Sequence, residues 1–127
     1  MHDKQLFEYA VIRVIPKVHR EEFLNVGVIL YCRDKRFLQS IFTLHRQKLI
    51  ALSTELDLEE IHKHLCAFEQ ICNGDPAGGP IALLDIASRF RWLTATRSTI
   101  VQASKVHPGL CINPQETLIK LHNDLVL

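Results

Sequence analysis

The sequence predicts an α+β fold: an antiparallel sheet of about four strands, with helices packed mainly on one face. Two observations predict it. Segments rich in β-branched and aromatic residues come first, and segments with the hydrophobic period of helices follow them. One further alternating segment, 99–104, then precedes a last helix. Strands grouped before helices, rather than alternating regularly with them, are typical of α+β domains.

The first three strands are expected near the N-terminal end. Residues 6–15 are rich in aromatic and β-branched types, and Pro16 ends the segment. Residues 26–32 and 37–43 are expected to pair as a hairpin that turns at Asp34–Lys35. The two-residue period of the first strand places five side chains on one face: Phe7, Tyr9, Val11, Arg13 and Ile15.

Two helices have clear start signals. The helix at 58–72 follows Asp57, and Glu60 three residues later resembles a capping box. The helix at 114–126 follows Asn113 and has Pro114 at its first position. Shorter helices are expected at 44–52 and at about 81–93, the latter after the loop 74–80.

Length and composition indicate one ordered domain over residues 1–127. The 47% hydrophobic and 23% charged residues are typical of globular proteins and argue against disorder. No apolar run approaches the roughly 20 residues of a membrane-spanning helix, and no apolar signal segment follows Met1. We therefore expect a cytoplasmic protein without a membrane contact. Four cysteines without a C-x-x-C pattern are expected to be reduced thiols: Cys32, Cys66, Cys72 and Cys111.

The net charge of +1 is unevenly distributed along the chain. Residues 1–48 carry +4, residues 49–88 carry −6 and residues 89–127 carry +3. A net charge near zero predicts no general attraction to nucleic acid or to anionic membranes. If the two basic ends of the chain come together in space, however, they form a weakly cationic surface.

Three motifs resemble part of a known functional site, but each lacks the other residues that such a site needs. The glycine-rich loop 74–80 precedes a helix N-terminus, but it has no P-loop Lys-Ser/Thr and a helix enters it instead of a strand. His62 and Cys66 have the i, i+4 spacing of metal ligands, without a second ligand pair of matching spacing. Neither a cysteine nor Ser98 stands in a nucleophile motif. We expect no metal site, no cofactor and no catalytic nucleophile.

Segment 89–97 mixes arginines with aromatic residues, a combination that binds single-stranded nucleic acid by stacking. The alternative is that Phe90 and Trp92 are buried at a helix end while the arginines stay on the surface. The second interpretation fits the expected helix better. Nucleic acid is therefore not an expected partner.

Arg13 is a charged residue on an otherwise apolar strand face. A buried guanidinium without a partner is costly, so a carboxylate or a bound anion should accompany it. Glu22 and Asn25 stand just before the neighbouring strand and are candidates for this partner. Arg97 and Ser98, before the fourth strand, are candidates for the same cluster. The cluster either fixes the strand register or binds a ligand or partner.

Several segments resemble the signature blocks of the bacterial domain-of-unknown-function family 3037. They are Tyr9-Ala-Val-Ile-Arg-Val-Ile-Pro16, residues 20–30, residues 91–102, and Val106-His-Pro-Gly-Leu110 with the following Asn-Pro helix. The resemblance implies a small bacterial cytoplasmic protein without an established activity. It implies that these residues occupy family motif positions: Arg13, Glu22, Asn25, Gly27, Trp92, Arg97, Ser98 and Gly109. Relatives are often encoded beside a HipA-like kinase, which implies an accessory or regulatory partner. Pro108 stands where the family has threonine.

Together these features favour a non-enzymatic module that binds a protein partner, with a HipA-like kinase as a candidate. The alternative is a small enzyme, or a nucleotide- or anion-binding domain, that uses the polar cluster around Arg13. The sequence has no activated nucleophile, metal ligand set or paired carboxylates, which favours the binding module. Convergence of the polar residues in a concave pocket would favour the alternative.

Overall fold

Five antiparallel strands form one sheet, as seen in a computed structural model that describes residues 3–97 and 99–127. The strands are β1 (Gln5–Val14), β2 (Leu24–Cys32), β3 (Phe37–Phe42), β4 (Val101–Ala103) and β5 (His107–Cys111). Their order is β3-β2-β1-β4, and β5 also pairs with β1. The strand β1 therefore has partners along both of its edges. The expected α+β fold, the β2–β3 hairpin and the fourth strand are confirmed.

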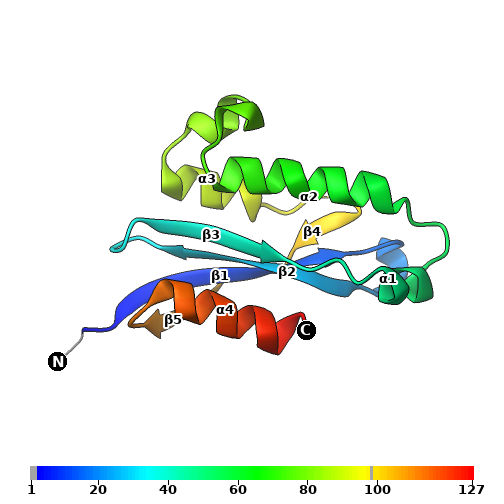
Figure 1. The fold of residues 1–127 in the computed structure, drawn as a ribbon, viewed down its shortest axis with the longest axis horizontal. Helices are drawn as coiled ribbons and strands as arrows, with labels where there is room; N and C mark the ends of the chain where they lie inside the picture. The colour runs from blue at the N-terminus through cyan, green and yellow to red at the C-terminus, as the bar shows by residue number, and fades with distance from the viewer. Residues whose placement is uncertain (1–2, 98) are drawn as a thin grey trace.

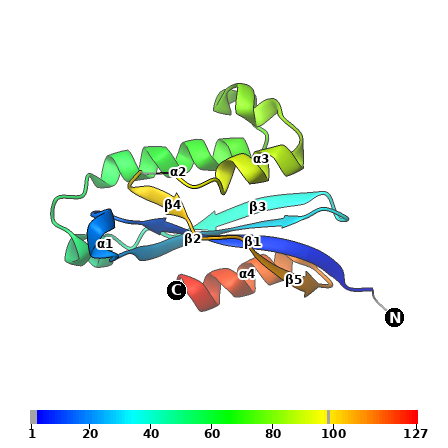
Figure 2. The ribbon, with the colours of Figure 1, turned by 180° about the vertical axis from the view of Figure 1, so that it is seen from behind.

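Four α-helices of the described residues accompany the sheet: α1 (Arg46–Leu52), α2 (Leu58–Cys72), α3 (Ile86–Leu93) and α4 (Pro114–Leu125). The helices α2 and α3 lie over one face of the sheet and α4 lies under the other (Figures 1 and 2). The expected caps are present, because the side chains of Asp57 and Asn113 accept hydrogen bonds from the backbone N–H groups of Glu60 and Glu116. None of the helices in the described part of the chain is long and apolar enough to span a bilayer.

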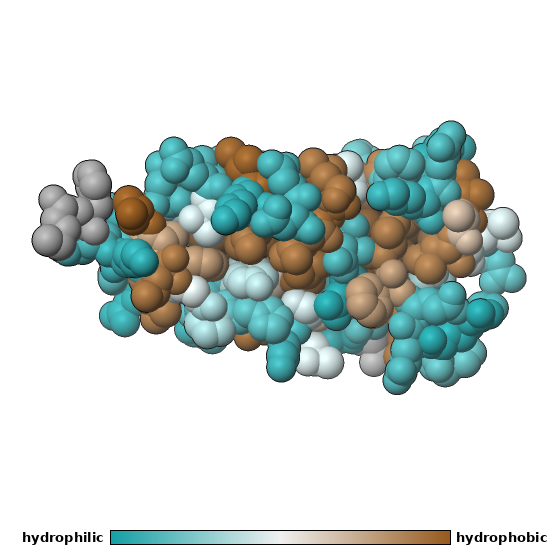
Figure 3. All heavy atoms as spheres, turned by 90° about the horizontal axis from the view of Figure 1, so that it is seen from below, coloured by the Kyte–Doolittle hydropathy of each residue, from teal (hydrophilic) through white to brown (hydrophobic). Residues whose placement is uncertain are grey.

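The sheet is buried on both faces. Alternate residues of β1, among them Ala10, Ile12 and Val14, pack with α2 and α3 in the larger core. Phe7 belongs to a second core that also contains Leu118 of α4. Figure 3 shows the face that carries α4, where hydrophobic residues are interspersed with hydrophilic ones. All four cysteines are unpaired, as expected, and Cys66 alone among them is exposed.

The helix expected at about 81–93 is shorter in the structure. Residues Pro80–Leu83 form a 3₁₀ turn, and α3 begins only at Ile86. The cause is Asp85, whose side chain accepts a hydrogen bond from the backbone N–H of Ser88 and so caps a new helix. The loop 74–80 contains another short 3₁₀ turn, Pro76–Gly78, and connects α2 to this region.

The strand β5 was not predicted, because Pro108 and Gly109 are both unfavourable in strands. Both β4 and β5 pair with β1, and the register of the pairing shifts by one residue between them. Ile12 faces Ala103 and Tyr9 faces His107, so one extra residue lies between the two pairs. At this bulge the Ser104 side chain takes the place of a backbone acceptor: its Oγ receives the Val11 N–H at 2.9 Å.

A second bulge lies on the other edge of β1. Ile12 faces Gly27, whereas the next residue, Arg13, faces Asn25. The Phe42 ring covers the strand at Gly27. A Cβ atom added to Gly27 would lie 2.3 Å from this ring. Only glycine leaves room for this contact.

His122 fastens α4 to the end of β3. The side chain is buried, and its Nε2 lies 2.9 Å from the Thr43 hydroxyl oxygen. Burial lowers the pKa of His122 below its ordinary value of 6.5. At neutral pH the folded state therefore favours the neutral form of this imidazole.

This environment predicts that His122 makes the protein less stable in acid. The unfolded chain protonates His122 near pH 6.5 and the folded chain only at lower pH. The free energy of unfolding should therefore fall as the pH drops through 6.5 and the lowered pKa. Urea denaturation of the wild type and of His122→Gln, from about pH 8 to about pH 5, isolates the effect. The difference in free energy of unfolding between the wild type and His122→Gln should shrink in acid. If the two free energies change with pH in parallel, the prediction is wrong.

Candidate functional site

Arg13 and Asn25 lie opposite each other on neighbouring strands. They are Cα partners across β1 and β2, and Gln102 of β4 faces Arg13 from the other edge. The neighbours Ile12 and Val14 point into the core with α2, so alternation places Arg13 on the opposite face, the one that carries α4.

The partner of the Arg13 guanidinium is an aromatic ring. Its Cζ atom lies 4.2 Å from the centroid of the Phe23 ring, which is the geometry of a cation–π contact. The Nε atom of Arg13 is buried and has no hydrogen-bond partner among the described residues. The expected partner was a carboxylate or a bound anion, with Glu22 and Asn25 as candidates, and Phe23 was not predicted. The sequence does show an aromatic residue between Glu22 and Asn25, and such a residue can be the partner of a guanidinium.

Asn25 connects the sheet to the last turn of α4. Its Nδ2 donates a hydrogen bond of 3.0 Å to the carbonyl oxygen of Leu125. Helices leave their final carbonyl groups without partners, and this bond satisfies one of them. The Oδ1 atom of Asn25 is buried without a partner in the described structure.

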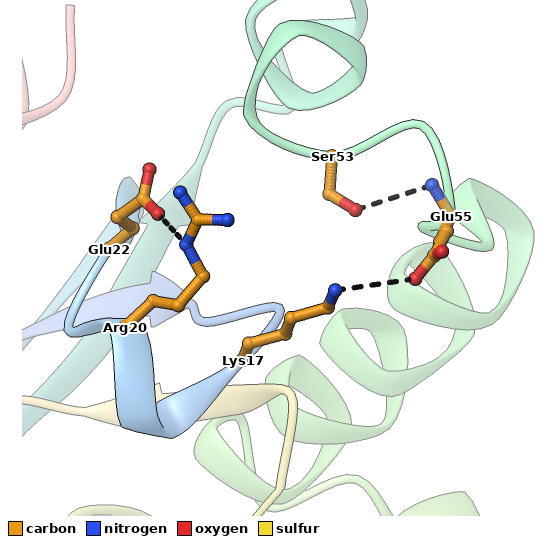
Figure 4. Close-up of polar contacts among 5 residues, drawn as sticks. All are labelled: Lys17, Arg20, Glu22, Ser53 and Glu55. Atoms are coloured by element: carbon orange, nitrogen blue, oxygen red, sulfur yellow. Dashed lines mark hydrogen bonds and ion pairs between the residues drawn. The ribbon is translucent and has the colours of Figure 1, made fainter.

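Glu22 pairs with Arg20 and not with Arg13. Figure 4 shows this ion pair in the connection between β1 and β2, opposite the link between α1 and α2. Lys17 and Glu55 form a second pair nearby, with 4.0 Å between nitrogen and oxygen. All four side chains are about half exposed or more, so solvent screens both interactions and each contributes little stability.

Arg97 lies on the other side of the sheet. Its guanidinium stacks over the Trp92 ring at 4.0 Å from the centroid and donates to the Trp92 carbonyl. It lines a small cavity with His64 and Phe68 of α2. Trp92 is 40% exposed, which corrects the expectation that the helix end buries it. Ser98 lies outside the described residues.

A large hollow of the described structure was not predicted as a site. It is a groove of about 750 Å³, open to solvent, between α3 and the turn that joins β2 to β3. We call it the arginine groove. Glu8 and Tyr31, which are Cα partners on β1 and β2, lie at its base. The other residues that line it are Arg33, Arg36, Asp85, Ile86, Ala87, Arg89 and Arg91.

Two arginines come from each side of the groove. At the β2–β3 turn, the backbone N–H of Arg36 donates to the Arg33 carbonyl at 3.0 Å, which folds the two residues together. On α3, Arg89 donates to the Leu84 carbonyl at 2.7 Å and Arg91 to the Ser88 hydroxyl at 3.4 Å. Arginines from the two basic segments of the sequence therefore meet here, which is the condition stated above for a cationic surface.

The positive charge of the arginine groove is only partly balanced by its own residues. Two carboxylates line it, and the hydrogen bond with Ser88 lowers the pKa of one of them, Asp85. Within residues 3–97 and 99–127, none of the four arginines forms an ion pair. The Nε of Arg89 is also buried without a hydrogen-bond partner. Such a surface attracts an external anion.

The other motifs remain isolated. His62 and Cys66 are 3.5 Å apart, Nε2 to Sγ, on the exposed side of α2. In the described residues, no group of three or more His, Cys, Asp and Glu side chains is placed to hold a metal ion. The side chain of Asp75 caps the 3₁₀ turn in the glycine-rich loop, which fits a connector.

The family described as protein of unknown function (DUF3037) matches residues 9–126. The chain belongs to this family. The match runs from the middle of β1 to the end of α4 and so covers most of the sheet and of both cores, and the residues of the arginine groove other than Glu8. No curated protein and no solved structure matches the chain.

The contacts of Asn25 and Glu22 predict different effects on stability. Asn25→Ala removes the bond to the Leu125 carbonyl and should lower the free energy of unfolding by about 1–2 kcal/mol. Glu22→Ala breaks an exposed ion pair and should cost less than about 1 kcal/mol. Urea denaturation measures both. A larger loss for Glu22→Ala would show that Glu22 has a buried partner instead.

Proposed function

We propose that this member of the family is a non-enzymatic module that docks on a protein partner in the bacterial cytoplasm, and that the arginine groove is its docking surface. One observation carries the proposal: four arginines line one open groove, and none forms an ion pair within the described residues. Uncompensated charge on an exposed surface is a feature that speeds and orients the binding of a charged partner.

The make-up of the groove supports docking over catalysis. No serine, cysteine or histidine is among the described residues that line it, so it offers no nucleophile with an adjacent base. The hollow is also wide open, whereas small-molecule sites usually enclose most of their ligand. The alternative based on the Arg13 cluster has less support, because Arg13 and Arg97 lie on opposite faces and Glu22 binds Arg20.

A HipA-like kinase is the first partner to test, because the family resemblance implies such a neighbour. The test compares the binding of two variants with the same change in net charge. Arg33→Glu with Arg36→Glu reverses two charges in the arginine groove, and Lys105→Glu with Lys120→Glu reverses two exposed charges elsewhere.

We expect the groove variant to bind the purified kinase at least about tenfold more weakly than the wild type, which corresponds to about 1.4 kcal/mol. The control variant should stay within about twofold, because isolated surface charges contribute little. Isothermal titration calorimetry measures both affinities, and circular dichroism checks the fold. Equal losses in the two variants would contradict docking at the groove.

A further inference from the structure

We infer that the arginine groove binds an acidic segment of the partner protein that carries apolar residues next to its acidic ones. This rests on the proposed function, since it names the chemistry of the partner at the same surface. The inference combines two observations: the charge of the groove and the exposed apolar residues that continue its base.

The charge of the groove selects carboxylates. A guanidinium binds a carboxylate through two parallel hydrogen bonds, and this geometry is specific. Arg89 and Arg91 are held on α3 by their bonds to Leu84 and Ser88, so the donors on this side are already positioned. Arg33 and Arg36 face them from the turn. An extended acidic segment lying between the two sides would contact both pairs.

An apolar pair lies next to the base of the groove. Leu6 and Leu110 are Cα partners across β1 and β5, and they are 57% and 63% exposed. Leu6 is two residues from Glu8 on β1, so the two side chains point to the same face, about 7 Å apart along the strand. The charged groove therefore continues into an apolar surface that matches hydrophobic side chains of a bound segment.

Nucleic acid fits this surface less well. Glu8 and Asp85 line the groove and repel any anion, so the preference for a peptide rests on the lack of free stacking rings and on the apolar pair. Tyr31 is the one aromatic side chain among the described lining residues, and its ring packs against Phe90 with 5.2 Å between centroids. Stacking on several free rings is the usual means of holding single strands. A nucleic acid would also leave Leu6 and Leu110 uncovered.

Fluorescence anisotropy with synthetic peptides tests the inference without the natural partner. The probe is a labelled peptide of about ten residues, with four glutamates followed by two leucines. One control peptide has glutamine in place of glutamate, and another has serine in place of leucine. A labelled oligothymidine of similar length is the nucleic-acid probe. The protein is the wild type, Arg33→Ser with Arg36→Ser, Leu6→Ser with Leu110→Ser, or the control Lys105→Ser with Lys120→Ser.

We expect the Glu–Leu peptide to bind the wild type more tightly than the other three probes. The arginine double variant should bind it roughly 5- to 30-fold more weakly, as for two charge pairs of up to about 1 kcal/mol each. The leucine double variant should lose affinity for this peptide but not for the peptide with serine.

Binding of the Glu–Leu peptide to the wild type should weaken as the salt concentration rises from about 0.05 M to about 0.5 M. The lysine control should match the wild type.

Three outcomes would overturn the inference: no binding of the Glu–Leu peptide, binding that the arginine variant retains, or tighter binding of oligothymidine. None of these depends on the kinase experiment. If the groove charge reversal abolishes kinase binding while the peptide fails, docking at the groove stands and the acidic segment is wrong. If the peptide binds at the groove and the kinase does not bind the wild type, the kinase is the wrong partner.

Discussion

The pairing of β1 along both edges is the interaction on which the rest of this molecule depends. It joins β2 on one side and β4 and β5 on the other, and both of its faces are buried. A shift of one residue in its register would exchange the two faces and expose the cores. The bulges beside Ile12 and at Ser104 act against such a shift, because each fits one alignment only.

The arginine groove depends on this register. Its base is the pair Glu8 and Tyr31, and the contact of Tyr31 with Phe90 sets α3 over the sheet. The turn after β2 then presents Arg33 and Arg36 toward the arginines of α3. Residues about fifty positions apart in the sequence thus share one surface. The same framework places Arg13 on the far face of the sheet, where Phe23 covers it.

The sequence predicts the elements whose signals lie within a few neighbouring residues, and it misses those that depend on contacts between distant segments. Strands 6–15 and 26–32 and the capped helices could be predicted because period and caps act over a few residues. The strand β5 could not, since pairing with β1 outweighs the unfavourable propensities of Pro108 and Gly109. The ring of Phe7 lies over Gly109 as that of Phe42 lies over Gly27, which explains both glycines. The groove follows from tertiary contacts, and only the charge distribution pointed to it.

Native-state hydrogen exchange, followed residue by residue by NMR, tests the central role of β1 most directly. The amides of residues 8–13 should exchange only through global unfolding, with free energies of exchange equal to that measured by urea denaturation. Amides of α1 and of the β2–β3 turn should exchange through smaller, local openings. If amides of α2 remain protected after those of β1 have exchanged, the sheet opens before its helices, and β1 does not hold the fold together.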